Sequence, residues 1–321
     1  MPDKKFISEI WTVLKNSFKG FVNDKVPKLS ASLSYYMIFS MGPLLLVIIT
    51  MCSIFLGREA IEGGIYRQLE NFTGADTALQ LQQIIKNASL SGKTIVATII
   101  GAITLLIGAT TVFGEMQDSI NMIWGVKAKP KKNWLKFFQD RIISFSVIIS
   151  LSFLLLVSLG ISALIEGFGN FLQQRFPDVT VVVFYIINLA ITMAITSFIF
   201  GIVFKVLPDA EIRWKDVLAG AVVTTILFLL GKFGISFYIS KTAVGSTYGP
   251  AGSLIILIVW IYYSAMILYF GAEFTKYYAL QYGAPIHPSK FAVTVQQIET
   301  EKGNLSIQQN EQVKDEKMQK K

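Results

Sequence analysis

The chain has 321 residues, of which 53% are hydrophobic and only 16% are charged. A soluble domain carries roughly 25% charged residues, so this composition argues against an ordinary soluble protein and favours one surrounded by lipid. The 29 Lys and Arg exceed the 21 Asp and Glu, which gives a net charge of +8. Either nucleic acid or a membrane surface fits such an excess, and the placement of the charges decides between them. Cys52 is the only cysteine, so no disulfide forms within the chain.

Six apolar stretches lie along the chain, each near or above the roughly 20 residues that a helix needs to cross a bilayer. In lipid every backbone N–H and C=O must be paired within its segment, so these stretches are predicted to be helices. The sequence therefore predicts an all-α, polytopic membrane protein with a six-helix membrane domain at residues 35–280. The predicted spans are residues 35–57, 94–114, 143–165, 181–207, 217–240 and 251–274.

Lys and Arg are distributed unequally between the segments that connect these spans. With spans that alternate in direction, 22 of them fall on the side of both termini and six on the opposite side, while Lys232 falls inside the fifth span. By the positive-inside rule the crowded side is cytoplasmic, which predicts a multi-pass protein with both termini in the cytoplasm. The basic excess is thus a topology signal, and no nucleic-acid partner is expected.

Three segments outside the spans have patterns of their own. Residues 1–34 are predicted to be a basic cytoplasmic segment with an amphipathic helix, which either lies in the headgroup plane of an anionic leaflet or packs against the ends of the bundle. Short outer helices are predicted between the first two spans, and residues 281–321 are predicted to be a disordered tail. The apolar residues of the amphipathic helix are Ile7, Ile10, Trp11, Leu14, Phe18, Phe21 and Val22.

Ionisable residues in or near the spans are the candidates for a transport pathway, because such groups are costly in lipid and need a partner or water. Lys232 falls in the outer half of the fifth span, where it either snorkels to the interface or lines a cavity for an anionic head group. Glu115, Lys205, Arg141 and Glu273 are predicted near the inner ends of their spans. They form either a belt of ion pairs or the inner mouth of a passage.

Two glycine–proline pairs are candidate helix breaks or hinges. Gly42-Pro43 falls within the first span and Gly249-Pro250 just before the last, and proline removes a helical hydrogen bond. Interrupted helices build the substrate site in many transporters, although proline kinks are also ordinary in membrane helices. His287 is the only histidine, so the sequence predicts no metal site, no cofactor and no enzymatic activity.

Three sequence blocks together resemble the YihY/BrkB family of bacterial inner-membrane proteins. They are residues 31–46 (ASLSYYMIFSMGPLLL), residues 113–127 (FGEMQDSINMIWGVK) and residues 248–275, which contain the element GAE. The blocks occur in order with the spacing of six helices, and the resemblance covers roughly residues 10–280. The residues that match the family motifs are Tyr35, Tyr36, Asn121, Trp124, Tyr248 and Trp260, with Glu273 in the GAE element.

The resemblance implies a location in the bacterial inner membrane, a link with the cell envelope and export of lipid-like molecules. Members were long labelled ribonuclease BN, a label generally regarded as mistaken, and the sequence lacks the His and Asp cluster of such metal-dependent chemistry. The first hypothesis is a transporter or flippase-like protein for an amphipathic or anionic envelope molecule, with membrane lipids as partners. A non-transporting scaffold or envelope regulator is the alternative, and a membrane-bound ribonuclease is the third. A homo-oligomer is compatible with each.

Overall fold

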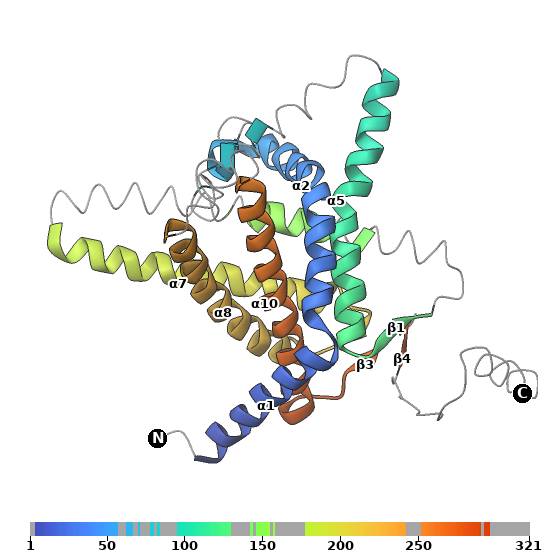
Figure 1. Cartoon of the computed structure of the whole chain (residues 1–321), viewed down its shortest axis with the longest axis vertical. Helices are drawn as coiled ribbons and strands as arrows, with labels where there is room; N and C mark the ends of the chain where they lie inside the picture. The colour runs from blue at the N-terminus through green and yellow to red at the C-terminus, as the bar shows by residue number, and fades with distance from the viewer. Residues whose placement is uncertain are drawn as a thin grey trace, which may run out of the picture.

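The described part of the chain consists mainly of long helices, with four short strands. The computed structural model describes residues 4–56, 62–66, 70, 78–79, 82–83, 95–129, 142–143, 146–154, 157, 177–241, 252–289 and 292–295. Most of these residues are helical, in agreement with the predicted all-α class (Figure 1).

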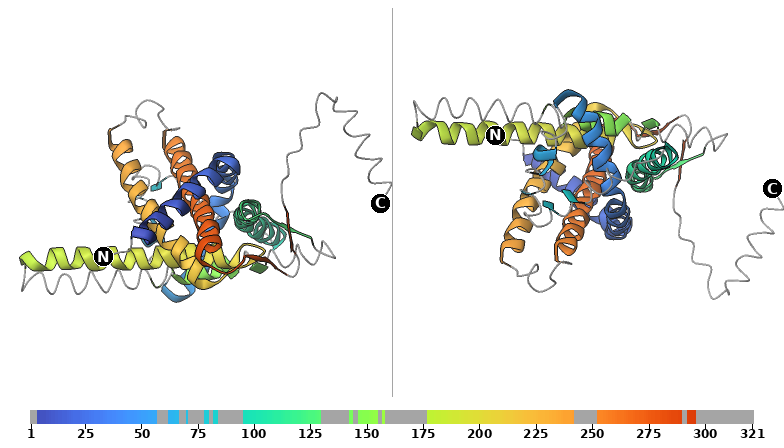
Figure 2. Two further views of the ribbon diagram at one scale, coloured as in Figure 1. Left: turned by 90° about the horizontal axis from the view of Figure 1, so that it is seen from below. Right: turned by 90° about the horizontal axis from the view of Figure 1, so that it is seen from above.

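The first helix, α1 (Lys4–Asn23), crosses the end of the bundle beside the last helix, α10 (Gly252–Tyr282), as the view from below in Figure 2 shows. Val13 and Ser17 are buried on the face toward the bundle. The opposite face is open, so α1 packs on the helix ends and also presents a free surface; its contact with a membrane stays a prediction. The side chains exposed on that free face are Trp11, Lys15, Phe18, Lys19 and Val22.

The helices α2 (Val26–Leu56) and α5 (Ile95–Ile123) pack side by side along much of their length. α2 continues through Pro43, because the loss of one hydrogen bond at a proline leaves the turns on either side intact. The predicted break at this point therefore does not end the helix. Gly125 terminates α5 with a φ of 65°, a left-handed conformation that glycine adopts without the steric cost of a Cβ.

Part of the third predicted span is also described. Residues 146–154 are helical, and Val147 and Ile148 pack against Leu44 of α2 and Phe113 of α5. Residues 62–66, between the first two spans, form one helical segment in the region where short outer helices are predicted.

The helices α7 (Pro177–Val206) and α8 (Trp214–Lys241) form a hairpin, and the short strand β2 (Ala210–Glu211) lies in the connection between them. At the start of α8, Arg213 Nε lies 3.2 Å from Asp216 Oδ2. An acidic group in the first turn of a helix is favoured by the helix dipole, so Asp216 helps to define where α8 begins.

Two glycine–threonine pairs bring α8 and α10 into close contact. A Cβ added at Gly220 of α8 would lie 2.9 Å from Thr275 Cβ of α10, and one added at Gly271 of α10 would lie 2.9 Å from Thr224 Cβ of α8. Each threonine hydroxyl donates to the carbonyl of the glycine four residues earlier in its own helix, at 2.7 Å. Small residues at these positions allow the two backbones to approach, as is common between membrane helices.

Two strands follow α10, in the segment that the sequence predicts to be a disordered tail. The strand β3 (His287–Pro288) pairs with β2, and β4 (Ala292–Thr294) pairs with β1 (Val126–Ala128). The beginning of this tail is therefore ordered by pairing with the two connections that follow α5 and α7. The low apolar content of the tail suggested disorder, but backbone pairing of two or three residues needs little side-chain burial.

The main hydrophobic core lies where the helix ends meet, toward the end of the bundle that carries β1–β4, which we call the strand-side end. The core joins residues of α2, α5, α7, α8 and α10, and its fully buried side chains include Val26, Ile123, Phe204, Val217 and Tyr269. Among the described helices, the beginning of α2, the ends of α5 and α7 and the beginning of α8 all meet here.

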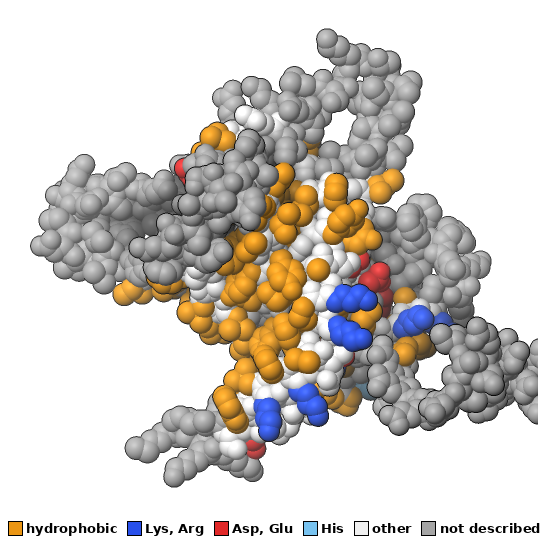
Figure 3. Space-filling model, in the orientation of Figure 1, with side chains coloured by type: hydrophobic (Ala, Val, Ile, Leu, Met, Phe, Trp, Pro, Cys, Tyr) orange, Lys and Arg blue, Asp and Glu red, His pale blue; other side chains and the backbone are white. Residues whose placement is uncertain are grey.

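Apolar side chains also cover much of the outside. On the face shown in Figure 3, hydrophobic side chains occupy the middle of the bundle, and the Lys and Arg side chains lie toward the strand-side end. Within the described residues, three segments are long and apolar enough to cross a membrane: Leu189–Val206, Trp214–Ile235 and Leu254–Tyr282. The total of six spans and the side on which the termini lie stay predictions.

Candidate functional site

The centre of the candidate site is Glu273, near the strand-side end of α10. Its side chain is fully buried, and neither carboxylate oxygen has a hydrogen-bond partner among the residues that the structure describes. Gly20 of α1 lies directly against it, since a Cβ added there would be 2.5 Å from Glu273 Oε2 and 2.9 Å from a ring carbon of Tyr277. A buried acidic group without a hydrogen bond is costly, so its presence in an apolar helix needs a reason.

Lys276 connects Glu273 to two other parts of the chain. Its Nζ lies 3.7 Å from Glu273 Oε2 and 3.4 Å from Asp24 Oδ2, in the turn between α1 and α2. It also donates a hydrogen bond of 2.6 Å to the carbonyl of Ile123, the last residue of α5. A cation at the C-terminal end of a helix satisfies a free carbonyl and interacts favourably with the helix dipole. One lysine thus ties α5, α10 and the α1–α2 turn together.

Trp124 joins two of the sequence blocks noted above. Its indole Nε1 donates a hydrogen bond of 3.0 Å to the carbonyl of Ala272, the residue before Glu273. Trp124 is buried in the main core, next to the glycine that terminates α5. The contact therefore fixes the end of α5 against the turn of α10 that carries the buried carboxylate.

A second polar cluster surrounds Asp209, in the connection between α7 and β2. Its carboxylate accepts hydrogen bonds from Asn121 Nδ2 at 3.0 Å and from Gln117 Nε2 at 3.3 Å, while its backbone N–H donates to Asn121 Oδ1 at 2.8 Å. All three side chains are buried. Asn121 therefore links α5 to the segment that follows α7 through two hydrogen bonds.

The residues predicted to form an inner charged belt do not all share one cluster. Glu273 pairs with Lys276, whereas Lys205 donates to the backbone carbonyl of Ile212. Glu115 is partly buried on α5, and Arg141 lies outside the described residues. Lys232 is partly buried on α8.

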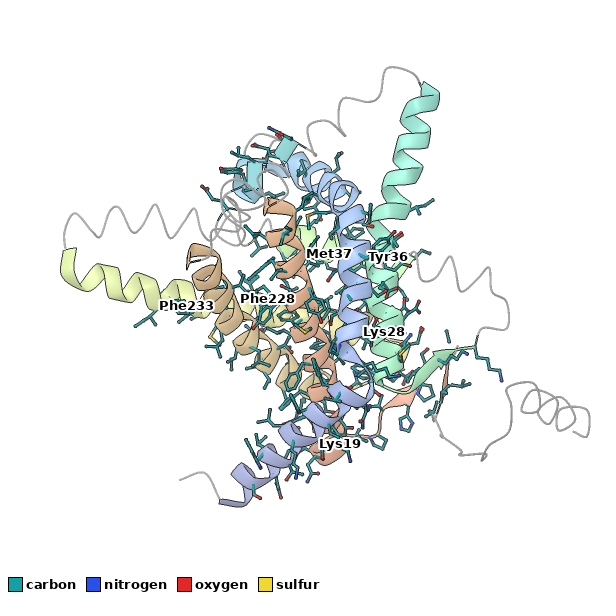
Figure 4. The ribbon with its side chains drawn as sticks, in the orientation of Figure 1. Lys19, Lys28, Tyr36, Met37, Phe228 and Phe233 are labelled. Atoms are coloured by element: carbon teal, nitrogen blue, oxygen red, sulfur yellow. The ribbon has the colours of Figure 1, made fainter. Side chains whose placement is uncertain are left out.

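The structure describes some of the candidate hinge residues and family-motif residues but not all of them. Gly42 is buried in α2, while Gly249, Pro250 and Tyr248 lie outside the described residues. Figure 4 marks Tyr36 on α2, next to the well-exposed Tyr35, and marks Phe228 on α8. Trp260 of α10 is buried and meets the Phe228 ring edge-on, with ring centroids 5.8 Å apart.

Four residues of the site were not anticipated from the sequence. The sequence spacing could have indicated Lys276, because it follows Glu273 by three residues and therefore lies on the same side of the helix. No sequence pattern indicates the other three residues, since each is brought to its partner from a distant part of the chain. They are Gly20, Asp24 and Asp209.

Comparison with known proteins places the chain in a family. The profile described as Virulence factor BrkB matches residues 17–292. The chain belongs to this family. The resemblance drawn from the three sequence blocks is thereby confirmed.

Curated relatives of this BrkB-family protein carry membrane names or a ribonuclease-like name. It is 26% identical over 270 residues to a "UPF0761 membrane protein" of Tolumonas auensis, covering 79% of this chain and 80% of that protein. It is 24% identical over 281 residues to one of Saccharophagus degradans, covering 85% and 61%. It is also 24% identical over 264 residues to the "Putative ribonuclease-like protein YfkH" of Bacillus subtilis, covering 81% and 92%. No solved structure matches the chain.

Proposed function

We propose that this BrkB-family protein moves an amphipathic, anionic molecule of the cell envelope between the leaflets of the membrane. The observation that carries the proposal is the Glu273 carboxylate, which is fully buried and has no hydrogen-bond partner within the described residues. Ionisable groups within membrane helices are costly and commonly mark the path of a substrate or a coupling ion. An apolar residue of similar volume would serve a purely structural purpose at lower cost.

The basic side chains support an anionic substrate. Lys19 of α1 and Lys28 of α2 are exposed toward the strand-side end (Figure 4), where they would attract anionic head groups. Lys232, on the apolar segment Trp214–Ile235, is the candidate cation further along the path. Together these residues provide positive charge at the entrance and within the membrane.

A flipping assay tests the proposal. Wild-type protein is reconstituted into vesicles with a fluorescently labelled anionic phospholipid, and dithionite bleaches the label in the outer leaflet. We expect wild type to expose the inner-leaflet label, and Glu273→Gln to slow this step at least about tenfold, equivalent to roughly 1.4 kcal/mol in the barrier. Glu211→Gln, the same change at an exposed strand residue, serves as the control and should behave as wild type.

Two outcomes would count against the proposal. If wild-type protein exposes no more inner-leaflet label than empty vesicles do, this lipid class is not moved. If Glu273→Gln flips lipid as fast as wild type, the buried carboxylate has no part in transport.

A scaffold function is the second candidate, and the free face of α1 favours it. Trp11, Phe18 and Val22 are 69%, 64% and 58% exposed, and beside them lie the exposed Lys15 and Lys19. Such a face suits a membrane surface or a partner helix. A partner that copurifies in stoichiometric amount, together with no lipid movement, would support the scaffold over the transporter.

The ribonuclease-like name of the Bacillus subtilis relative raises a third function that we do not adopt. Within the described residues, no three or more His, Cys, Asp or Glu side chains are grouped so as to hold a metal ion. Incubation of the purified protein with RNA and divalent metal, against a mock preparation, tests this function directly.

A further inference from the structure

Two carboxylates share one ammonium group at the strand-side end. Lys276 Nζ lies 3.7 Å from the Glu273 carboxylate and 3.4 Å from that of Asp24. With both acids ionised, the three groups would carry one negative charge in excess beside the apolar core. An uncompensated charge away from water is costly, and in proteins it is commonly removed by a bound proton.

The two carboxyl groups differ in how far they are buried. The Asp24 side chain is 29% exposed, so water can solvate its charge, whereas the Glu273 side chain is 0% exposed. Lys276 also donates to the Ile123 carbonyl, which holds the ammonium at the end of α5. We infer that Glu273 is a proton-binding site, reached from the strand-side end past the partly exposed Asp24 and Lys276.

The groups around Glu273 leave it few other ways to be neutralised. Among the described residues, the charged groups beside it are Lys276, whose Nζ lies 3.7 Å from Glu273 Oε2, and Asp24, which shares that lysine. From α10, the ring of Tyr277 also lies against Gly20. From α5, the Trp124 indole is already engaged with the Ala272 carbonyl. A proton bound to Glu273 removes the excess negative charge, so no further basic side chain is needed.

Proton binding at this site is linked to the position of α1. Gly20 packs against the carboxyl group, and Asp24 directly follows α1 in the chain. When Glu273 is protonated, Lys276 remains with Asp24. When the proton leaves, the Glu273 carboxylate competes with Asp24 for Lys276, and the tie between the α1–α2 turn and α10 weakens. A coupling of this switch to lipid movement rests on the proposed function, whereas proton binding itself does not.

Infrared spectroscopy of the full-length protein in lipid nanodiscs tests the inference without any transport assay. A protonated carboxylic acid shows a C=O stretching band that disappears when it ionises. Near neutral pH, where solvent-exposed Asp and Glu are ionised, we expect this band in wild type, its loss in Glu273→Gln and its retention in Glu211→Gln. A second variant, Lys276→Met, should let the band persist to higher pH, because the cation that favours the ionised acid is gone.

The outcomes separate this inference from the proposed function. Circular dichroism and size-exclusion chromatography first establish that each variant is folded. A band near neutral pH that survives Glu273→Gln, or a folded wild type without a band at that pH, overturns the proton site whatever the flipping assay gives. Loss of the band in Glu273→Gln with unchanged flipping supports the proton site and rejects only its role in transport.

Discussion

Three consecutive residues of α10 each contact a different element of the fold. They are Gly271, Ala272 and Glu273, which in the sequence are simply part of an apolar helix. Gly271 admits a threonine of α8, the Ala272 carbonyl accepts the Trp124 indole N–H, and Glu273 faces α1. Three consecutive residues of a helix point about 100° apart, so one turn can contact three elements. The GAE element thus marks a junction of helices as well as a buried acid.

Gly20 is expected to be intolerant of a side chain. Gly20→Ala places a Cβ 2.5 Å from Glu273 Oε2, and we expect it to lower the free energy of unfolding by about 1–3 kcal/mol, the usual cost of overpacking. Chemical denaturation in detergent measures the effect. Gly114→Ala on α5 is the matched control, because nothing lies within 4 Å of the added Cβ.

A double variant assigns the cost of Gly20→Ala to the contact with Glu273. In a Glu273→Ala background the carboxyl group is absent, so adding Gly20→Ala should cost less than it does in wild type. An equal cost in both backgrounds would place the strain elsewhere.

The sequence identified some residues of the site but none of the contacts across it. Glu273, Asn121 and Trp124 stood out through their motif blocks and, for Glu273, through a charge near a span. Their partners Asp24, Asp209 and Gly20 are ordinary residues in loops or amphipathic segments, and only tertiary packing brings them close. A single sequence holds no signal for such long-range pairs.

Among the secondary-structure elements, the apolar runs predicted the helices well but not where they end. α5 continues past residue 114 to Ile123, and α10 continues past residue 274 to Tyr282. These extensions contain more polar residues than the predicted spans, and their buried residues, such as Ile120, Ile123 and Ala279, pack in the main core. The edge of an apolar run in the sequence therefore does not mark the end of a helix.

The close crossing of α8 and α10 gives a sharp test of helix packing. Gly220→Ala is expected to lower the free energy of unfolding by about 3 kcal/mol, because the new Cβ would lie within 3.2 Å of the Thr275 backbone. Gly234→Ala on the same helix meets nothing within 4 Å and should be neutral or slightly stabilising, since alanine is the better helix former. Equal effects of the two variants would show that the crossing is looser than described.

Across the whole molecule, orientation follows from charge and can be measured directly. We expect both termini in the cytoplasm, because 22 Lys and Arg fall on their side of the membrane and six on the other. In a Cys52→Ser background, a membrane-impermeant maleimide added to spheroplasts should label Gly63→Cys at once, but Lys129→Cys only after lysis. Both positions are exposed, so the same labelling pattern at the two sites would contradict the orientation.

The pairing of β3 and β4 has a consequence for how the protein is made. The strands β1 and β2 leave the ribosome long before their partners, which lie at residues 287–294. Until then each keeps an open edge of unpaired backbone groups. Residues 287–294 can therefore pair with the connections that follow α5 and α7 only after all the described helices have been synthesised. This pairing is thus a late step in the folding of the protein.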